Sequence, residues 1–163
     1  MNNRKELLKF ANLLKKLANN TYTELGSGFK EDTFQKALSI CFRLYNIDYF
    51  KETNIEIFFK KESLGVFRLD FLIPPQKHKS FTLKNAIVIE TKVSVSIKNP
   101  ARLQLKNYLE SLPKNKSEIF KNVSEGFILN WHDGDNAEDI PKEGVDLELW
   151  SLKSKKFKEI PIK

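Results

Sequence analysis

Apolar residues recur at intervals of three and four in three segments of the chain, a spacing that places them on one face of a helix. The first segment, 4–18, has lysines between its apolar positions and predicts an amphipathic helix. The second runs over about 29–45, and Ser27 is expected to cap its first turn. The third covers 101–112 and follows Pro100, a residue that suits the start of a helix.

Five further segments are typical of β-strands, because they are short, rich in β-branched and aromatic residues, and bounded by turn residues. They are residues 49–60, 66–73, 87–93, 126–131 and 146–152. The order of two helices, three strands, a helix and two strands predicts one α/β or α+β domain over 1–163. We expect a central mixed sheet of about four or five strands flanked by helices.

The chain carries 28 Lys and Arg against 21 Asp and Glu, a formal net charge of +7. This balance is typical of proteins that bind nucleic acid, although a solvated lysine-rich surface gives the same count. Only four basic residues are Arg, so the composition favours phosphate contacts over base reading. The chain is 40% hydrophobic, which is enough for a substantial core.

A single cysteine, Cys41, excludes an internal disulfide and argues against a cysteine zinc site. A reducing, intracellular compartment fits this usage. Lysines interrupt every apolar run in the first twenty residues, so we expect neither a secretory signal nor a membrane span.

Two opposite charges, Glu90 and Lys92, lie inside the strand pattern "IVIETKV" at 87–93. Side chains of a strand alternate between two faces, so both charges share a face with Val88. The opposite face takes Ile87, Ile89, Thr91 and Val93. A simple ion pair on an edge strand would also explain the two charges.

Two more carboxylates are embedded in apolar sequence. Asp70 lies in "VFRLDFLI", where alternation predicts that it shares a face with Arg68 and Leu72. Glu31 falls on the apolar stripe of the second helix, with Phe34. An ion pair with Arg68 would account for Asp70, and the helix dipole would account for an acid in the first turn at Glu31.

Buried carboxylates need a cation, hydrogen bonds or a metal. Two carboxylates side by side favour Mg²⁺ or Mn²⁺, which carboxylates hold together with water and substrate phosphate. Such a metal lowers the pKa of bound water, and a neighbouring Lys92 would orient that water or stabilise the transition state. Asp70, Glu90 and Lys92 thus predict metal-assisted cleavage of a phosphodiester, with Glu31 in the same cleft. The backbone carbonyl of Thr91 is expected to add one oxygen ligand.

The order of these residues resembles the PD-(D/E)xK nuclease superfamily, which has an Asp on one strand and D/E-x-K on the next. Here the matching positions are Asp70 and Glu90-Thr91-Lys92. The chain is most similar to the GxxExxY branch, through "LGSGFKEDTFQKAL", "LGVFRLDFLI" and "LQLKNYL". Phe34 stands where that branch has Tyr. The resemblance covers roughly 24–131, leaving an extra N-terminal amphipathic helix in 1–20 and a C-terminal strand extension in 132–163.

The resemblance implies a restriction-endonuclease-like core in which Asp70 and Glu90 bind metal and Lys92 is the catalytic lysine. It also implies that Glu31 is a further metal or water ligand and that Gln104 reaches the site from the later helix. The two loop histidines, His78 and His132, and the loop acids, Asp133 and Asp135, are expected to be solvated rather than catalytic.

The leading hypothesis is therefore a divalent-metal-dependent nuclease that hydrolyses DNA, with DNA expected ahead of RNA. The alternative is a catalytically silent module that binds nucleic acid or another protein through the same fold. If both strands of a duplex are cut, a homodimer is expected, because each chain offers one site.

Overall fold

The computed structural model describes residues 1–133 and 144–163, with three α-helices among them. Helix α1 (Arg4–Leu25) extends beyond the predicted end at residue 18, and the Asn3 side chain caps it by accepting from the Lys5 N–H. Helix α2 (Glu31–Leu44) begins after Lys30 with no side-chain cap, so the predicted cap at Ser27 is wrong. Helix α3 (Asn99–Ser111) has Pro100 in its first turn, as predicted.

The main sheet has six strands rather than the four or five predicted, in the order β1-β2-β5-β6-β7-β8. Their bounds are β1 Phe50–Phe59, β2 Glu62–Ile73, β5 Ile87–Ser94, β6 Glu125–His132, β7 Val145–Lys153 and β8 Lys156–Ile160. Among the described strands of this sheet, only the β5–β6 pair is parallel, and α3 forms the crossover between these strands. Strand β8 was not predicted, because three of its five residues are charged.

Three smaller elements connect the main ones. Strands β3 (Gln76–Lys77) and β4 (Thr82–Leu83) pair as a separate two-stranded sheet after β2. Two short 3₁₀ helices, η1 (Leu112–Lys114) and η2 (Glu118–Phe120), follow α3.

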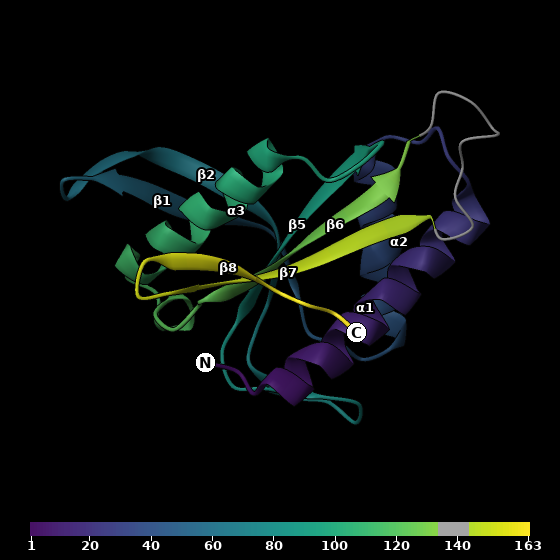
Figure 1. Ribbon diagram of the computed structural model, residues 1–163, viewed down its shortest axis with the longest axis horizontal. Helices are drawn as coiled ribbons and strands as arrows, with labels where there is room; N and C mark the ends of the chain where they lie inside the picture. The colour runs from purple at the N-terminus through teal and green to yellow at the C-terminus, as the bar shows by residue number, and fades with distance from the viewer. Residues whose placement is uncertain (134–143) are drawn as a thin grey trace.

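The sheet separates two hydrophobic clusters. Helices α1 and α2 cover one face and α3 covers the other (Figure 1). Within β5, Ile87 and Ile89 pack with the α1 and α2 side chains, whereas Val88 packs with the α3 side chains. The predicted alternation of β5 is thereby confirmed. No helix in the described part of the chain is long and apolar enough to cross a membrane.

Strand β2 does not alternate regularly, contrary to the prediction for Asp70. Leu69 and Leu72 both belong to the α3-side cluster, whereas Phe71 and Ile73 belong to the other cluster. The break falls at Asp70, opposite Glu52 of β1, whose φ is 59°. An L-residue with positive φ inside a strand bends the ladder locally. The bend turns Asp70 towards β5.

Candidate active site

The candidate site lies where β2 and β5 separate. Their pairing ends at Phe71 and Ile89, and the Asp70 carboxylate occupies the gap beyond. One oxygen of Asp70, Oδ2, accepts from the Thr91 backbone N–H at 2.8 Å. A side-chain oxygen thus takes the place of a ladder carbonyl, which leaves the end of the gap open to a ligand.

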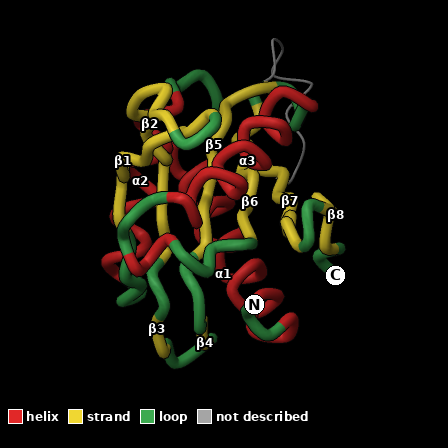
Figure 2. The backbone as a smooth tube through the Cα atoms, turned by 90° about the vertical axis from the view of Figure 1, so that its left-hand side faces the viewer, coloured by secondary structure: helices red, strands yellow, loops and turns green. Residues whose placement is uncertain are grey.

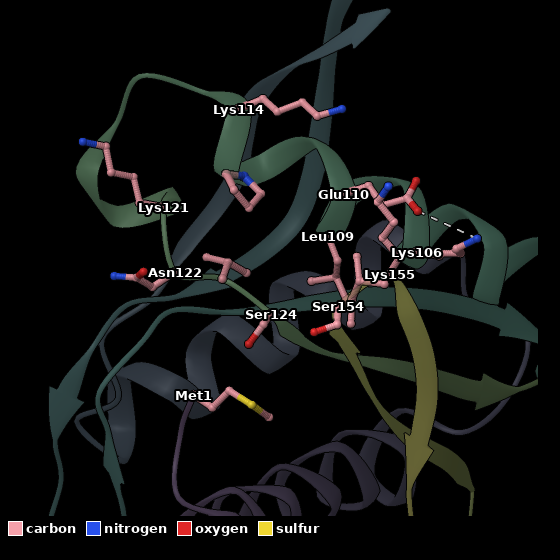
Figure 3. Close-up of a pocket in the computed structure, with 13 residues that line it drawn as sticks. Met1, Lys106, Leu109, Glu110, Lys114, Lys121, Asn122, Ser124, Ser154 and Lys155 are labelled. Carbon is pink, nitrogen blue, oxygen red and sulfur yellow. Dashed lines mark ion pairs between the residues drawn. The ribbon is translucent and has the colours of Figure 1, made fainter.

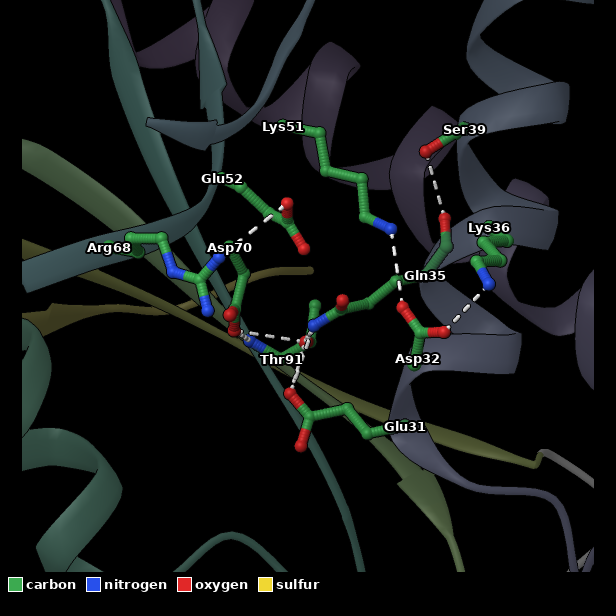
Figure 4. Close-up of polar contacts among 10 residues, drawn as sticks. All are labelled: Glu31, Asp32, Gln35, Lys36, Ser39, Lys51, Glu52, Arg68, Asp70 and Thr91. Carbon is green, nitrogen blue, oxygen red and sulfur yellow. Dashed lines mark hydrogen bonds and ion pairs between the residues drawn. The ribbon is translucent and has the colours of Figure 1, made fainter. Parts of the chain in front are cut away.

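The hydroxyl of Thr91 joins three side chains. Its Oγ1 lies 2.8 Å from Glu31 Oε1, 3.0 Å from Asp70 Oδ2 and 2.7 Å from Gln35 Nε2 (Figure 4). Gln35 donates to the hydroxyl and to Glu31. Because a hydroxyl carries one proton, it can donate to only one of the two carboxylates at a time. Burial, followed by the charge of Asp70, raises the pKa of Glu31.

Glu31 therefore reaches the site from the α2 side of the sheet, through Thr91. The prediction placed it in a common cleft with Glu90 and Lys92. Thr91 points to the opposite face from its two neighbours, yet the charges of Asp70 and Lys92 both act on the pKa of Glu31. A role for Glu31 in the reaction stays a prediction.

Glu90 is almost fully enclosed, with 2% of its surface exposed. Its Oε1 accepts a long hydrogen bond of 3.5 Å from the Asp70 N–H, and it forms no ion pair with Lys92 or any other described residue. Burial, together with the nearby Asp70 charge, raises the pKa of Glu90 well above its ordinary value. The simple ion-pair explanation of Glu90 and Lys92 therefore fails.

Lys92 points towards α3, where its Nζ donates to Gln104 Oε1 at 3.1 Å. The other end of the same amide, Nε2, donates to the Tyr108 hydroxyl at 3.0 Å. The helix is fixed against β7 by Arg102, which donates from two nitrogens to the carboxylate of Glu148 at 2.9 and 2.5 Å. The structure thus brings the predicted Gln104 to Lys92, held by Tyr108.

A cavity of about 400 Å³ opens beside Asp70 on the α2 side. Its wall includes Glu31, Gln35 and Arg68 (Figure 4). Arg68 pairs with Glu52 at 3.8 Å rather than with Asp70, so the alternative of an Asp70–Arg68 ion pair is wrong.

Comparison with known families finds a match over most of the chain. The family model of the PD-(D/E)XK nuclease superfamily matches residues 9–136. The chain belongs to the PD-(D/E)XK nuclease superfamily. No curated protein and no solved structure matches the chain. The six-stranded mixed sheet agrees with the restriction-endonuclease-like fold of this superfamily, and membership supports a nuclease-type function.

Nucleases of this superfamily typically use divalent metals. The donor set suits a divalent metal. Asp70 and Glu90 offer oxygens, and the buried Glu90 carboxylate forms no ion pair among the described residues, although the charge of Lys92 acts on it from a distance. In an extended strand the N–H and C=O of one residue point the same way. Since the Thr91 N–H points to Asp70, the Thr91 carbonyl also points into the gap.

These residues do not form a complete metal cage. Among the described residues, no three His, Cys, Asp or Glu side chains are grouped closely enough to hold an ion alone. A cation held by Asp70 and Glu90 would complete its shell with the Thr91 carbonyl, water and substrate phosphate, as Mg²⁺ commonly does.

Both histidines have structural partners. His78 Nε2 lies 2.7 Å from the Tyr45 carbonyl and its ring stacks on Phe81, while His132 Nε2 lies 3.1 Å from Asp146. Asp133 is exposed, and Asp135 lies outside the described residues. Phe34 is fully buried and stacks on Trp131, so packing accounts for it.

Sequence reasoning missed Gln35 of α2. It lies four residues after Glu31, the spacing that places two helical side chains on the same face. This spacing could have predicted its role. An inward carboxylate on an apolar stripe needs a hydrogen-bond partner, and Gln35 is a polar residue on the same face.

Proposed function

We propose that the protein is a divalent-metal-dependent nuclease that hydrolyses phosphodiester bonds of DNA. The observation that carries the proposal is the contact of Asp70 with a buried Glu90 that forms no ion pair, beside a lysine held by Gln104. A buried carboxylate with a raised pKa and a specific charged neighbour is characteristic of a functional site. We assign the metal to Asp70, Glu90 and the Thr91 carbonyl.

When bound, Mg²⁺ or Mn²⁺ would supply an acidified water and neutralise charge on the phosphate. The chain's own residues supply the rest. Lys92, held by Gln104, presents its ammonium to the attacking water and to the developing negative charge. Glu31 and Gln35 hold Thr91, and through it the orientation of the Asp70 carboxylate.

DNA is the proposed polymer because the net charge of +7 suits a polyanion and the few Arg residues favour phosphate contacts over base reading. Cutting of both strands would require a second site, so we propose a homodimer for a duplex-cleaving form.

Cleavage assays with Mg²⁺ and Mn²⁺ over single-stranded, duplex, flap and junction DNA and structured RNA test the function. Lys92→Ala and Asp70→Asn should abolish cleavage while each variant keeps a cooperative unfolding transition. Lys98→Ala removes an exposed lysine from the loop after β5 and serves as the matched control. Equal cleavage by wild type, Lys92→Ala and Asp70→Asn would overturn the proposal. Nucleic-acid binding without cleavage of any substrate would support the silent binding module instead.

A further inference from the structure

Two hairpin turns of the main sheet have an unusual composition. Phe59 pairs with Glu62 and Lys153 pairs with Lys156, so each hairpin closes with a two-residue loop. All four loop residues have positive φ: Lys60 48°, Lys61 70°, Ser154 49° and Lys155 63°. Positive φ at both loop residues is the geometry of a type I′ turn, which strongly prefers Asn-Gly.

Lysine is a costly choice at these positions. A left-handed backbone costs an L-residue other than Gly, Asn or Asp roughly 1–2 kcal/mol. Lys60, Lys61 and Lys155 occupy such positions, and all three side chains are exposed. Lys60 lies over the exposed Phe59 ring at 5.5 Å, and none of the three side chains is part of a buried cluster. A strained backbone that persists in this way suggests a function for the side chains.

In Figure 1 both turns lie at the left-hand end of the molecule, together with the C-terminal end of α3. They lie at opposite edges of the sheet, as Figure 2 shows from that end. Asn115, just after η1, bonds the backbone N–H and C=O of Glu56 in β1 at 2.9 and 3.0 Å, which ties this segment to the first hairpin. A hollow of about 760 Å³ then connects the α3 end with the β7–β8 turn, and Lys114, Lys121 and Lys155 lie on its wall (Figure 3).

We call this surface the lysine end and define it by Lys60, Lys61, Lys114, Lys121 and Lys155. Only Lys121 has an ion-pair partner among the described residues, Glu118. The other four ammonium groups form no ion pair among the described residues, although Glu110 also lines the hollow. A set of exposed lysines without Arg matches a sugar–phosphate backbone, because lysine is a point charge that reads no base edge.

The strand β2 connects this end directly with the candidate active site. Nine residues of extended chain separate Lys61 from Asp70, which is roughly 30 Å. A duplex covers that length in about nine base pairs. We propose that the lysine end, and above all its two hairpin turns, holds phosphates of the substrate about one turn of duplex away from the bond that is cut. This inference rests on the proposed nuclease function and adds the path of the substrate to it.

The test replaces the two turns with the residues that their geometry prefers. The variant Lys60→Asn, Lys61→Gly, Ser154→Asn, Lys155→Gly removes three charges and relieves the backbone cost, so its melting temperature should equal or exceed that of wild type. The matched control Lys16→Gln, Lys77→Gln, Lys79→Gln removes three exposed lysines elsewhere. Fluorescence anisotropy with a labelled duplex of about 30 base pairs, in EDTA, measures affinity over a salt series.

The turn variant should bind the long duplex at least about tenfold more weakly, and the slope of log K against log[salt] should fall by roughly 2 to 3. The control should keep most of the affinity and slope. A duplex of about six base pairs, too short to reach the turns, should bind both variants equally. Equal loss in turn variant and control, or no loss in either, would overturn the inference. So would loss of binding to anionic lipid vesicles with duplex binding unchanged.

Cleavage of the duplex by wild type with Mg²⁺ separates the two proposals. If wild type cleaves and the turn variant binds the long duplex normally, the nuclease function stands and the lysine end is excluded. If wild type cleaves no nucleic acid, the proposed function itself fails, whatever the anisotropy shows.

Discussion

The carboxylate of Asp70 accepts from the backbone N–H of Thr91 at 2.8 Å, in the place where a carbonyl of β2 would continue the β2–β5 ladder. The carboxylate takes the place of this carbonyl because β2 bends at Asp70, opposite the positive φ of Glu52. It separates two strands and keeps the exposed backbone satisfied at the same time. A carboxylate held by a backbone donor is fixed in position before any ligand arrives, which is the condition for an organised site.

Metal binding should be linked to stability and pH through Glu90. Its folded-state pKa is raised above the ordinary 4.5 by burial and by Asp70, so the folded protein holds more protons than the unfolded chain above pH 4.5. The free energy of unfolding should therefore decrease as pH rises from 4.5 through the raised pKa. A cation that binds the ionised carboxylates should raise the free energy of unfolding again, by about 2.7 kcal/mol when the free cation is at a hundredfold excess over its Kd.

Thermal unfolding across pH, with Mn²⁺ or EDTA, measures this linkage. Glu90→Gln should show a weaker loss of stability with pH and little stabilisation by Mn²⁺. Glu118→Gln removes an exposed carboxylate and should behave like wild type. Equal stabilisation of Glu90→Gln and wild type by Mn²⁺ would show that the metal binds elsewhere.

Replacing Thr91 with Val should separate the role of its hydroxyl from that of its backbone. The change keeps the N–H bond to Asp70 and removes the hydroxyl that contacts Glu31, Asp70 and Gln35. Loss of a buried hydrogen-bond partner should lower the free energy of unfolding by about 1–3 kcal/mol. Cleavage should fall on the order of tenfold, because Glu31 is no longer held at the site.

Urea unfolding and single-turnover cleavage at saturating Mg²⁺ measure the two effects. Thr53→Val, in a half-buried position of β1 that lies opposite Leu69, is the control and should leave cleavage unchanged. Wild-type cleavage by Thr91→Val would mean that the Thr91 hydroxyl, and the contact through which it holds Glu31, are not needed for the reaction.

The strand part of the site could be predicted from sequence, whereas the helix part could not be placed fully. Glu90 and Lys92 stand out because charges inside an apolar strand need partners, and strict alternation fixes their face. Asp70 stands out for the same reason, but its direction depends on a bend set by Glu52 of the neighbouring strand. Nothing local to β2 predicts that bend.

The fold, like the site, could be predicted only where local sequence determines the structure. Amphipathic helices and apolar strands were predicted to within about four residues at each end, because their apolar faces form the two clusters; the exception is α1, which continues to Leu25 beyond its predicted end at residue 18. Strand β8 was missed, since it pairs at the sheet edge with few buried side chains. The positive φ of the hairpin turns was not predicted either, because Lys60 and Lys61 carry no signal for it. Pairing of distant strands imposes that geometry.

Gly126 should be required for the close packing of α3 on the sheet. A Cβ at this position would lie 2.6 Å from Leu105 Cδ1 and 3.2 Å from the Val88 carbonyl oxygen. Gly126→Ala should therefore cost about 1–3 kcal/mol of stability through overpacking. Gly65→Ala places a Cβ in open space but at a φ of 129°, so it tests backbone strain without a clash.

Cleavage measured alongside unfolding shows whether the packing of α3 matters for the site. Because Leu105 adjoins Gln104 on α3, displacement of the helix by Gly126→Ala should also reduce cleavage, whereas Gly65→Ala should lose stability alone. Full activity of folded Gly126→Ala would show that the site tolerates a shift of α3.

Tyr108 should act on cleavage only through Gln104. Its hydroxyl accepts from Gln104 Nε2 at 3.0 Å, which turns Oε1 of the same amide towards Lys92 Nζ. Tyr108→Phe leaves the amide free to rotate, and its NH₂ group would then face the ammonium in part of the population. The expected result is a decrease in kcat of about tenfold with KM unchanged, since ordering of Lys92 serves the transition state.

A double-mutant cycle tests this assignment. Gln104→Ala removes the partner of Lys92 and should reduce kcat more than Tyr108→Phe does. If Tyr108 acts through the amide alone, the double variant should equal Gln104→Ala, because no amide remains for the hydroxyl to orient. Full additivity of the two losses would instead assign Tyr108 a separate role, in packing or beside the buried Glu90. Burial is the main cause that raises the pKa of Tyr108, and the charge of Glu90 is the second.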